Sequence, residues 1–159
     1  MNLVISPGMQ RISWVIGKGD TFYKKGLIHA PRNIVGSKRI FYLADSFNVV
    51  IDSIYKAYYS DIQNIAITNL TVSKSSSAFI VVSELRGIIR YKLYKNFLRK
   101  PLDITTESIV KIHNIANANT TKQRDKMVYD AIRNMGYSVE KVEEAYAITG
   151  LMVLERKED

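Results

Sequence analysis

No proline occurs between Pro31 and Pro101, and the apolar residues of that stretch are largely β-branched or aromatic. Residues of these types favour a pleated, half-buried backbone. Prolines are confined to the edges and bulges of sheets, so their absence also suits a sheet interior. The stretch therefore predicts strands, rather than helices, over most of its length.

Short apolar runs separated by turn-forming residues indicate about seven strands before residue 100. The clearest pair lies on either side of Asp45 and Ser46 and is typical of a β-hairpin, and Gly87 marks a second turn of the same kind. The expected strands lie near residues 11–16, 22–28, 39–44, 48–52, 62–67, 78–82 and 89–93.

Part of this pattern resembles the pleckstrin-homology-like (PH-like) superfold, specifically its GRAM-type and prokaryotic branches. The resemblance is carried by the strand that Arg39 opens, by the strand that ends at Asp52, and by the step Tyr59-Ser60-Asp61-Ile62 into a third strand. It spans about residues 10–98. It implies an α+β protein whose N-terminal part is an antiparallel β-barrel or sandwich of about seven short strands.

The pattern changes at Pro101, because proline cannot donate to a sheet ladder and disfavours helix in the residue before it. We therefore expect two units, a PH-like basic β module over residues 1–100 and a helical unit over residues 101–159. Capping residues predict three helices and a final strand. The helices begin at Thr105 or Thr106, at Thr120 and at Ser138, the last two end at Gly136 and Gly150, and the strand covers 151–154.

Residues 131–157 resemble the end of a helix-turn-helix or winged-helix unit, with Gly136-Tyr137-Ser138 as the turn. An ordinary helical hairpin is the alternative interpretation. A helix that reads DNA is expected to be basic, whereas the helix expected after Ser138 carries Glu140, Glu143 and Glu144 against Lys141. We therefore expect this unit to contact protein.

The charge of the chain is divided at the same boundary. Residues 1–100 carry 15 Lys and Arg against 5 Asp and Glu, a net charge of +10, whereas residues 101–159 carry 8 against 10, a net charge of −2. An excess of this size attracts acidic proteins, anionic membranes and nucleic acids alike. An acidic partner is therefore expected to meet the first part of the chain.

Basic residues alternate with aromatic residues in several patches of this first part. In the run at 89–93, strand periodicity would place Arg90 and Lys92 on one face and the apolar residues on the other. We predict a basic and aromatic binding face made of Lys24, Lys25, Lys38, Arg39, Lys56, Arg86, Arg90, Lys92, Lys95, Arg99 and Lys100.

No motif predicts a catalytic or metal site. The chain has no cysteine, and its two histidines, His29 and His113, have no metal-binding spacing. Gly17-Lys18-Gly19-Asp20-Thr21 lacks the spacing of a phosphate-binding loop and is better explained as a hairpin turn. We therefore expect no catalytic residue, no metal and no cofactor.

These observations predict a non-enzymatic, cytoplasmic adaptor that binds an acidic protein partner or an anionic surface and takes no small-molecule substrate. The cytoplasmic location follows because no basic segment precedes a long apolar run near Met1. Two alternatives stay open at this stage: a winged-helix-like regulator that binds nucleic acid, and a GRAM-like protein attached to an anionic membrane.

Overall fold

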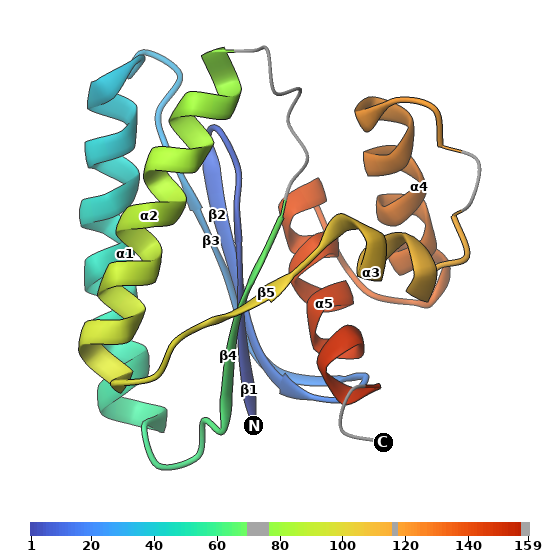
Figure 1. The fold of residues 1–159 in the computed structure, drawn as a ribbon, viewed down its shortest axis with the longest axis horizontal. Helices are drawn as coiled ribbons and strands as arrows, with labels where there is room; N and C mark the ends of the chain where they lie inside the picture. Colours follow the sequence, from blue (N-terminus) through green and yellow to red (C-terminus); the bar gives the residue numbers. More distant parts are fainter. Residues whose placement is uncertain (70–76, 116–117, 157–159) are drawn as a thin grey trace.

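The computed structural model describes residues 1–69, 77–115 and 118–156, and within them the chain forms one open sheet with helices on both faces (Figure 1). The strands are β1 (Asn2–Pro7), β2 (Arg11–Lys18), β3 (Thr21–His29), β4 (Asn64–Thr68) and β5 (Leu102–Ile104). Their order across the sheet is β3-β2-β1-β4-β5. β2 is antiparallel to both β1 and β3, whereas β4 is parallel to β1 and β5 is parallel to β4.

The helices are α1 (Ser37–Tyr58), α2 (Ser77–Phe97), α3 (Thr106–Ile112), α4 (Thr121–Asn134) and α5 (Val142–Glu155). α1 and α2 lie side by side on one face of the sheet. α5 covers the other face, and α3 and α4 pack against α5 (Figure 1). The central strands β1, β2 and β4 are therefore buried on both faces, whereas most residues of β3 are exposed or half-buried.

The central strand β1 connects the two layers of the core. Leu3 and Ile5 belong to the apolar cluster beneath α1 and α2, whereas Val4 belongs to the cluster beneath α5. All three side chains are fully buried, and each such burial stabilises the fold by about 1.5–3 kcal/mol. Because both faces of β1 are covered, Leu3, Val4 and Ile5 in its middle form a continuous apolar run with no polar residue between them.

The expected hairpin at 39–52 lies instead within the helix α1. Its buried residues recur at helical spacing: Ile40, Leu43, Ala44, Phe47, Ile51 and Ile54. This spacing forms one apolar stripe along a helix, which packs on the sheet and on α2. The strand prediction was wrong because packing of the stripe outweighs the weak β-propensity of the individual residues.

α2 replaces the two strands expected at 78–82 and 89–93 for the same reason. Val82, Leu85, Ile89 and Leu93 are buried at spacings of three and four residues. Gly87, expected in a turn, lies in the middle of the helix. Arg90 and Lys92 consequently lie on a helix and do not share the face of a strand.

The PH-like and GRAM-type resemblance is therefore wrong. The protein is α+β, but its sheet has five strands in a mixed, open arrangement, whereas the resemblance implied a closed antiparallel barrel or sandwich of about seven strands. Three of the expected strands, near 11–16, 22–28 and 62–67, do correspond to β2, β3 and β4. The others are helical, and β1 was not expected.

In the last third of the chain the first two expected helices are confirmed. Thr105 caps α3 by accepting a hydrogen bond from the Ser108 backbone N–H, and Thr120 caps α4 by accepting one from the Gln123 backbone N–H. The third helix begins at Val142, well after Ser138, and continues to Glu155. The strand expected at 151–154 is thus part of α5. Because α5 packs on β1 and β2, the helix-turn-helix resemblance is also wrong.

The division of the chain into units 1–100 and 101–159 stays a prediction. Across the ranges 1–69, 77–115 and 118–156, no helix combines the length and the apolar character that a membrane crossing requires.

Candidate functional site at the carboxyl edge of the sheet

Four of the five strands end at the same edge of the sheet. β4 and β5 are parallel to β1, and β3 has the same direction because it is antiparallel to β2. We call this side the carboxyl edge. In open sheets flanked by helices, ligands bind in the crevice outside the carboxyl ends of the strands. The side chains at this edge are therefore the first candidates for function.

Two hydroxyl side chains lie at the carboxyl ends of the central strands. Ile5 of β1 pairs with Ile67 of β4, so the next residues, Ser6 and Thr68, lie beside each other on the face that α5 covers. Both residues are fully buried, and neither hydroxyl has a hydrogen-bond partner among the described residues. Native proteins rarely leave buried hydroxyls without a partner, and those that do occur often mark functional positions.

The first turn of α5 brings two buried carboxylates to the same edge. Glu143 lies against the turn between β1 and β2, where a Cβ added to Gly8 would come within 2.5 Å of its Oε1 atom. This carboxylate pairs with Arg11 of β2, the Arg11 Nη1 atom being 3.6 Å from Glu143 Oε1. Its second oxygen, Oε2, has no hydrogen-bond partner among the described residues.

Glu144 is held by more contacts. Lys25 Nζ lies 3.0 Å from Glu144 Oε1 and also donates to the Ser138 carbonyl. The backbone N–H groups of Glu140 and Lys141 donate to Glu144 Oε2. Burial acts to raise the pKa of Glu144, but these hydrogen bonds and the charge of Lys25 outweigh it and lower the pKa. Glu144 is therefore an ionised, fully engaged carboxylate.

The basic residues predicted from the sequence do not form one face. They are distributed over β3, over both ends of α1, along α2 and after its end: Lys24 and Lys25, Lys38 and Arg39, Lys56, Arg86, Arg90, Lys92 and Lys95, and Arg99 and Lys100. Among the members of this set that lie on helices, only Lys38 and Arg39 are at the carboxyl edge, because they belong to the first turn of α1. Both α1 and α2 end at the opposite edge of the sheet (Figure 1).

Several of these residues are used inside the protein. Arg86 and Arg90 both pair with Asp103 of β5, and Lys92 pairs with Asp52 of α1. The remaining internal contacts are those of Arg39 with the Ile34 carbonyl, of Arg99 with the Ile62 and Gln63 carbonyls, of Lys24 with the Tyr58 ring and of Lys95 with the Tyr91 ring. Lys38, Lys56 and Lys100 are exposed. As binding residues, the whole set stays a prediction.

Sequence reasoning missed the residues that the fold gathers at the carboxyl edge: Ser6, Arg11, Thr68, Glu143 and Glu144. The only signal in the sequence is that Ser6 and Thr68 each follow a run of apolar residues. Which strands are neighbours, and which helix covers them, is decided by long-range packing.

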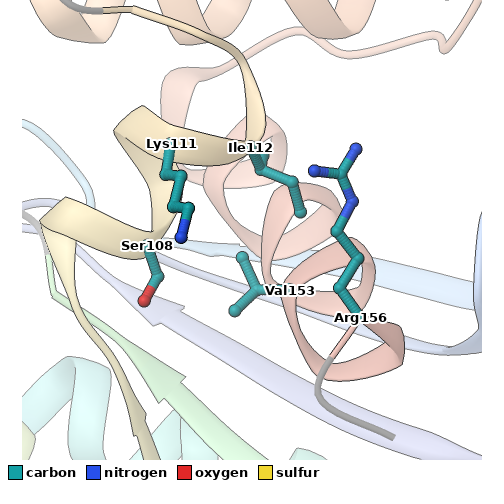
Figure 2. A pocket seen from close by; sticks show the side chains of 5 residues that line it. All are labelled: Ser108, Lys111, Ile112, Val153 and Arg156. Carbon is teal, nitrogen blue, oxygen red and sulfur yellow. The ribbon is translucent and has the colours of Figure 1, made fainter. Parts of the chain in front are cut away.

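A hollow of about 300 Å³ lies away from this edge, between α3 and the end of α5. Ser108 and Lys111 of α3 line it on one side and Arg156 on the other, with Ile112 and Val153 between them (Figure 2). Its two cationic side chains suit an anion, but Arg156 lies at the opposite end of α5 from Glu143 and Glu144.

No group of three or more His, Cys, Asp or Glu residues is placed to hold a metal ion within the ranges 1–69, 77–115 and 118–156. Of the two histidines, His29 is exposed, and His113 Nε2 lies 2.7 Å from Thr149 Oγ1. Burial lowers the pKa of His113, and the neighbouring charge of Arg156 adds to that effect.

No protein-family description matches the sequence, and no curated protein matches it either. Solved structures do. RuvC of T. thermophilus in complex with its Holliday junction substrate has 11% sequence identity and a TM-score of 0.62, over 99% of this chain and 97% of the RuvC chain. A second structure of Thermus thermophilus RuvC has 12% identity and a TM-score of 0.60, over 95% and 92% of the two chains.

These likenesses correct the function predicted from the sequence. The non-enzymatic adaptor and the winged-helix regulator both assumed a fold that the chain does not have, and a solved structure with the fold that it does have is RuvC in complex with a Holliday junction substrate. At this level of identity the comparison establishes the architecture alone. The chain has the fold of RuvC over nearly its whole length.

Proposed function

We propose that this protein binds branched DNA at its carboxyl edge. The observation that carries the proposal is the likeness, over 99% of the chain, to RuvC bound to a Holliday junction. A branched DNA presents phosphates from several arms at once, so a compact basic protein can contact many of them.

The charge of the chain supports this substrate. Its net charge is +8 and its isoelectric point is about 9.6, which attracts the phosphate backbone through long-range electrostatics. Arg32, in the loop before α1, and Lys38, in the first turn of α1, are exposed at the carboxyl edge (Figure 1). We assign these two side chains to phosphate contacts, together with those predicted basic residues that have no internal ion pair.

An acidic protein partner, which was inferred from the positive charge of residues 1–100, is not part of this proposal, because the solved structure that carries the proposal contains DNA as the partner. A cytoplasmic location agrees with the proposal and stays a prediction from the sequence.

The residues at the carboxyl edge do not fit the metal centre that nucleases commonly use. Two-metal sites clamp the attacking and leaving oxygens of a phosphodiester, and Mg²⁺ in such sites is held by carboxylates. Here the strand ends supply the neutral hydroxyls of Ser6 and Thr68, and the two nearby carboxylates are already paired with Arg11 and Lys25. We therefore assign no reaction step to a metal at this edge.

An electrophoretic mobility-shift assay tests the proposal. A four-way junction, a linear duplex and a single strand, built from the same oligonucleotides, are titrated with the full chain at ~50 mM and ~200 mM salt. We expect the junction to bind most tightly, with affinity falling by roughly 10³ or more between the two salt concentrations if many phosphates are contacted. Equal affinity for all three DNAs, or a flat salt response, would refute the proposal.

A further inference from the structure

The start of α5 places two buried acids against the sheet, Glu143 beside Gly8 in the turn after β1 and Glu144 beside Lys25 of β3. Glu143 and Glu144 are 6% and 7% exposed, although acidic residues are rarely buried unless they are paired. A buried carboxylate needs either a cation or several hydrogen-bond donors to offset its loss of water. The group that supplies the counter-charge, a metal ion or a basic side chain, therefore shows which kind of cation the start of α5 accommodates.

In this chain the counter-charges come from the sheet itself. Arg11 on β2 faces Glu143, and Lys25 on β3 faces Glu144. Both cations are largely shielded from solvent, with side-chain exposures of 23% for Arg11 and 28% for Lys25. Each carboxylate is thus paired with a cation of the sheet, Glu143 with one on β2 and Glu144 with one on β3.

A divalent ion at the same place would meet an unfavourable environment. It would lie close to two positive side chains, and like charges at short range in a shielded site repel strongly. The other oxygens at the strand ends, on Ser6 and Thr68, are neutral and offset none of the ion's charge. Mg²⁺ and Mn²⁺ prefer carboxylate ligands, and here the charge of each carboxylate is already offset, that of Glu143 by Arg11 and that of Glu144 by Lys25.

We infer that the ion pairs Glu143–Arg11 and Glu144–Lys25 take the place of a divalent metal at the carboxyl edge. They dock the first turn of α5 onto β2 and β3 and leave this edge without affinity for Mg²⁺ or Mn²⁺. Joined to the proposed function, on which this last consequence rests, the inference means that junction binding needs no divalent cation.

The decisive experiment uses the metal alone, without DNA. The full chain is freed of metal with EDTA, dialysed, and titrated with Mn²⁺ in a calorimeter, and its Tm is recorded with and without about 1 mM Mn²⁺, the weak end of the range for oxygen-ligand sites. We expect no saturable heat and no rise in Tm. Saturable binding that Glu143→Gln abolishes would overturn the inference.

Adding carboxylates provides the converse test. The double variant Ser6→Asp/Thr68→Glu adds two acids at the strand ends, and we expect it to acquire saturable Mn²⁺ binding and a Tm that rises with Mn²⁺. Ser53→Asp/Ser83→Glu adds the same two charges at exposed positions of α1 and α2 and serves as the matched control. If the first variant does not fold, the Mn²⁺ titration of the unmodified chain still tests whether the carboxyl edge binds a divalent ion.

A measurement of junction binding distinguishes failure of this inference from failure of the proposed function. Junction binding is measured in EDTA and in Mg²⁺ at matched ionic strength, and equal affinities are expected. Binding that appears only with Mg²⁺ would overturn the inference alone. Failure to bind the junction in either buffer would overturn the proposed function and leave the metal titration as the test of the inference.

Discussion

Ser6 of β1 and Ser13 of β2 lie opposite each other in the sheet, yet their hydroxyls differ in hydrogen bonding. Ser13 Oγ donates to the Gly26 carbonyl at 3.3 Å, whereas Ser6 Oγ has no partner among the described residues. A buried hydroxyl without a partner costs about 1–3 kcal/mol of stability, while a made hydrogen bond contributes about 0.5–1.5 kcal/mol. The same residue type thus has opposite energetic consequences at neighbouring positions.

We expect Ser6→Ala to leave the free energy of unfolding unchanged or to raise it by about 1 kcal/mol, because it removes an unpaired polar group. Ser13→Ala, the matched control, should lower it by about 1 kcal/mol through loss of its hydrogen bond. Urea denaturation of both variants measures the difference. A Ser6→Ala variant as destabilised as Ser13→Ala would show that the Ser6 hydroxyl has a partner.

The lowered pKa of Glu144 makes the protein less stable in acid. Its folded pKa lies below the unfolded value, so its contribution is fully present above the unfolded pKa and is lost as pH falls through the folded pKa. We expect Glu144→Gln to be less stable than the unmodified chain near neutral pH and to show a smaller loss of stability on acidification. Thermal unfolding between about pH 7 and pH 3 tests this, since the ordinary glutamate pKa lies inside that window. Parallel curves for the two proteins would contradict the expectation.

At the scale of elements, α5 shows why the end of a helix was misjudged. Its sequence is apolar on nearly all sides because the sheet, α3 and α4 enclose it, so it lacks the stripe of a surface helix. Gly150 was expected to stop the helix, but it lies within it. A Cβ at this position would meet Val4 Cγ1 at 2.6 Å and Ile104 Cδ1 at 3.0 Å. The glycine allows α5 to approach β1 and β5 closely.

Gly150→Ala sets two effects against each other. Alanine gains about 1 kcal/mol of helix propensity over glycine, whereas overpacking of a filled core costs about 1–3 kcal/mol. We expect net destabilisation of up to about 2 kcal/mol, measured as a lower urea midpoint. Gly87→Ala is the control, because a Cβ in the middle of α2 would meet nothing within 4 Å. That variant should be stabilised by roughly 0.5–1 kcal/mol, and a loss of stability there would contradict this account.

At the scale of the whole molecule, the positive charge is distributed over both ends of the helical layer. α1 starts at the carboxyl edge with Lys38 in its first turn and ends at the opposite edge with Lys56 in its last turn (Figure 1). Both side chains are exposed, so the same substitution at each position changes the total charge equally and tests where DNA binds.

We expect Lys38→Glu to weaken junction binding and to reduce the slope of log affinity against log salt by about 1 or more, because a phosphate contact is lost and a repulsion is added. Lys56→Glu, with the same change in net charge, should weaken binding far less. Fluorescence anisotropy with a labelled junction at several salt concentrations provides the comparison. Equal losses for the two variants would show that binding follows net charge and not the carboxyl edge.

Local chemistry predicted the parts of this fold that depend on neighbours in sequence. The threonine caps at Thr105 and Thr120 and the strands near 11–16, 22–28 and 62–67 were correct, because a cap or a short strand is specified within a few residues. The net charge, which the sequence also determines, is compatible with a DNA partner.

Tertiary structure alone decided the rest. Residues 39–52 have the composition of strands, but they form a helix because their apolar stripe packs on the sheet and on α2. Ser6 and Thr68 are 62 positions apart and become neighbours only because β1 pairs with β4. Bringing distant segments together costs conformational entropy, and only the many contacts of the assembled core offset that cost. Neither the fold of RuvC nor the grouping of side chains at the carboxyl edge can therefore be predicted from local sequence patterns.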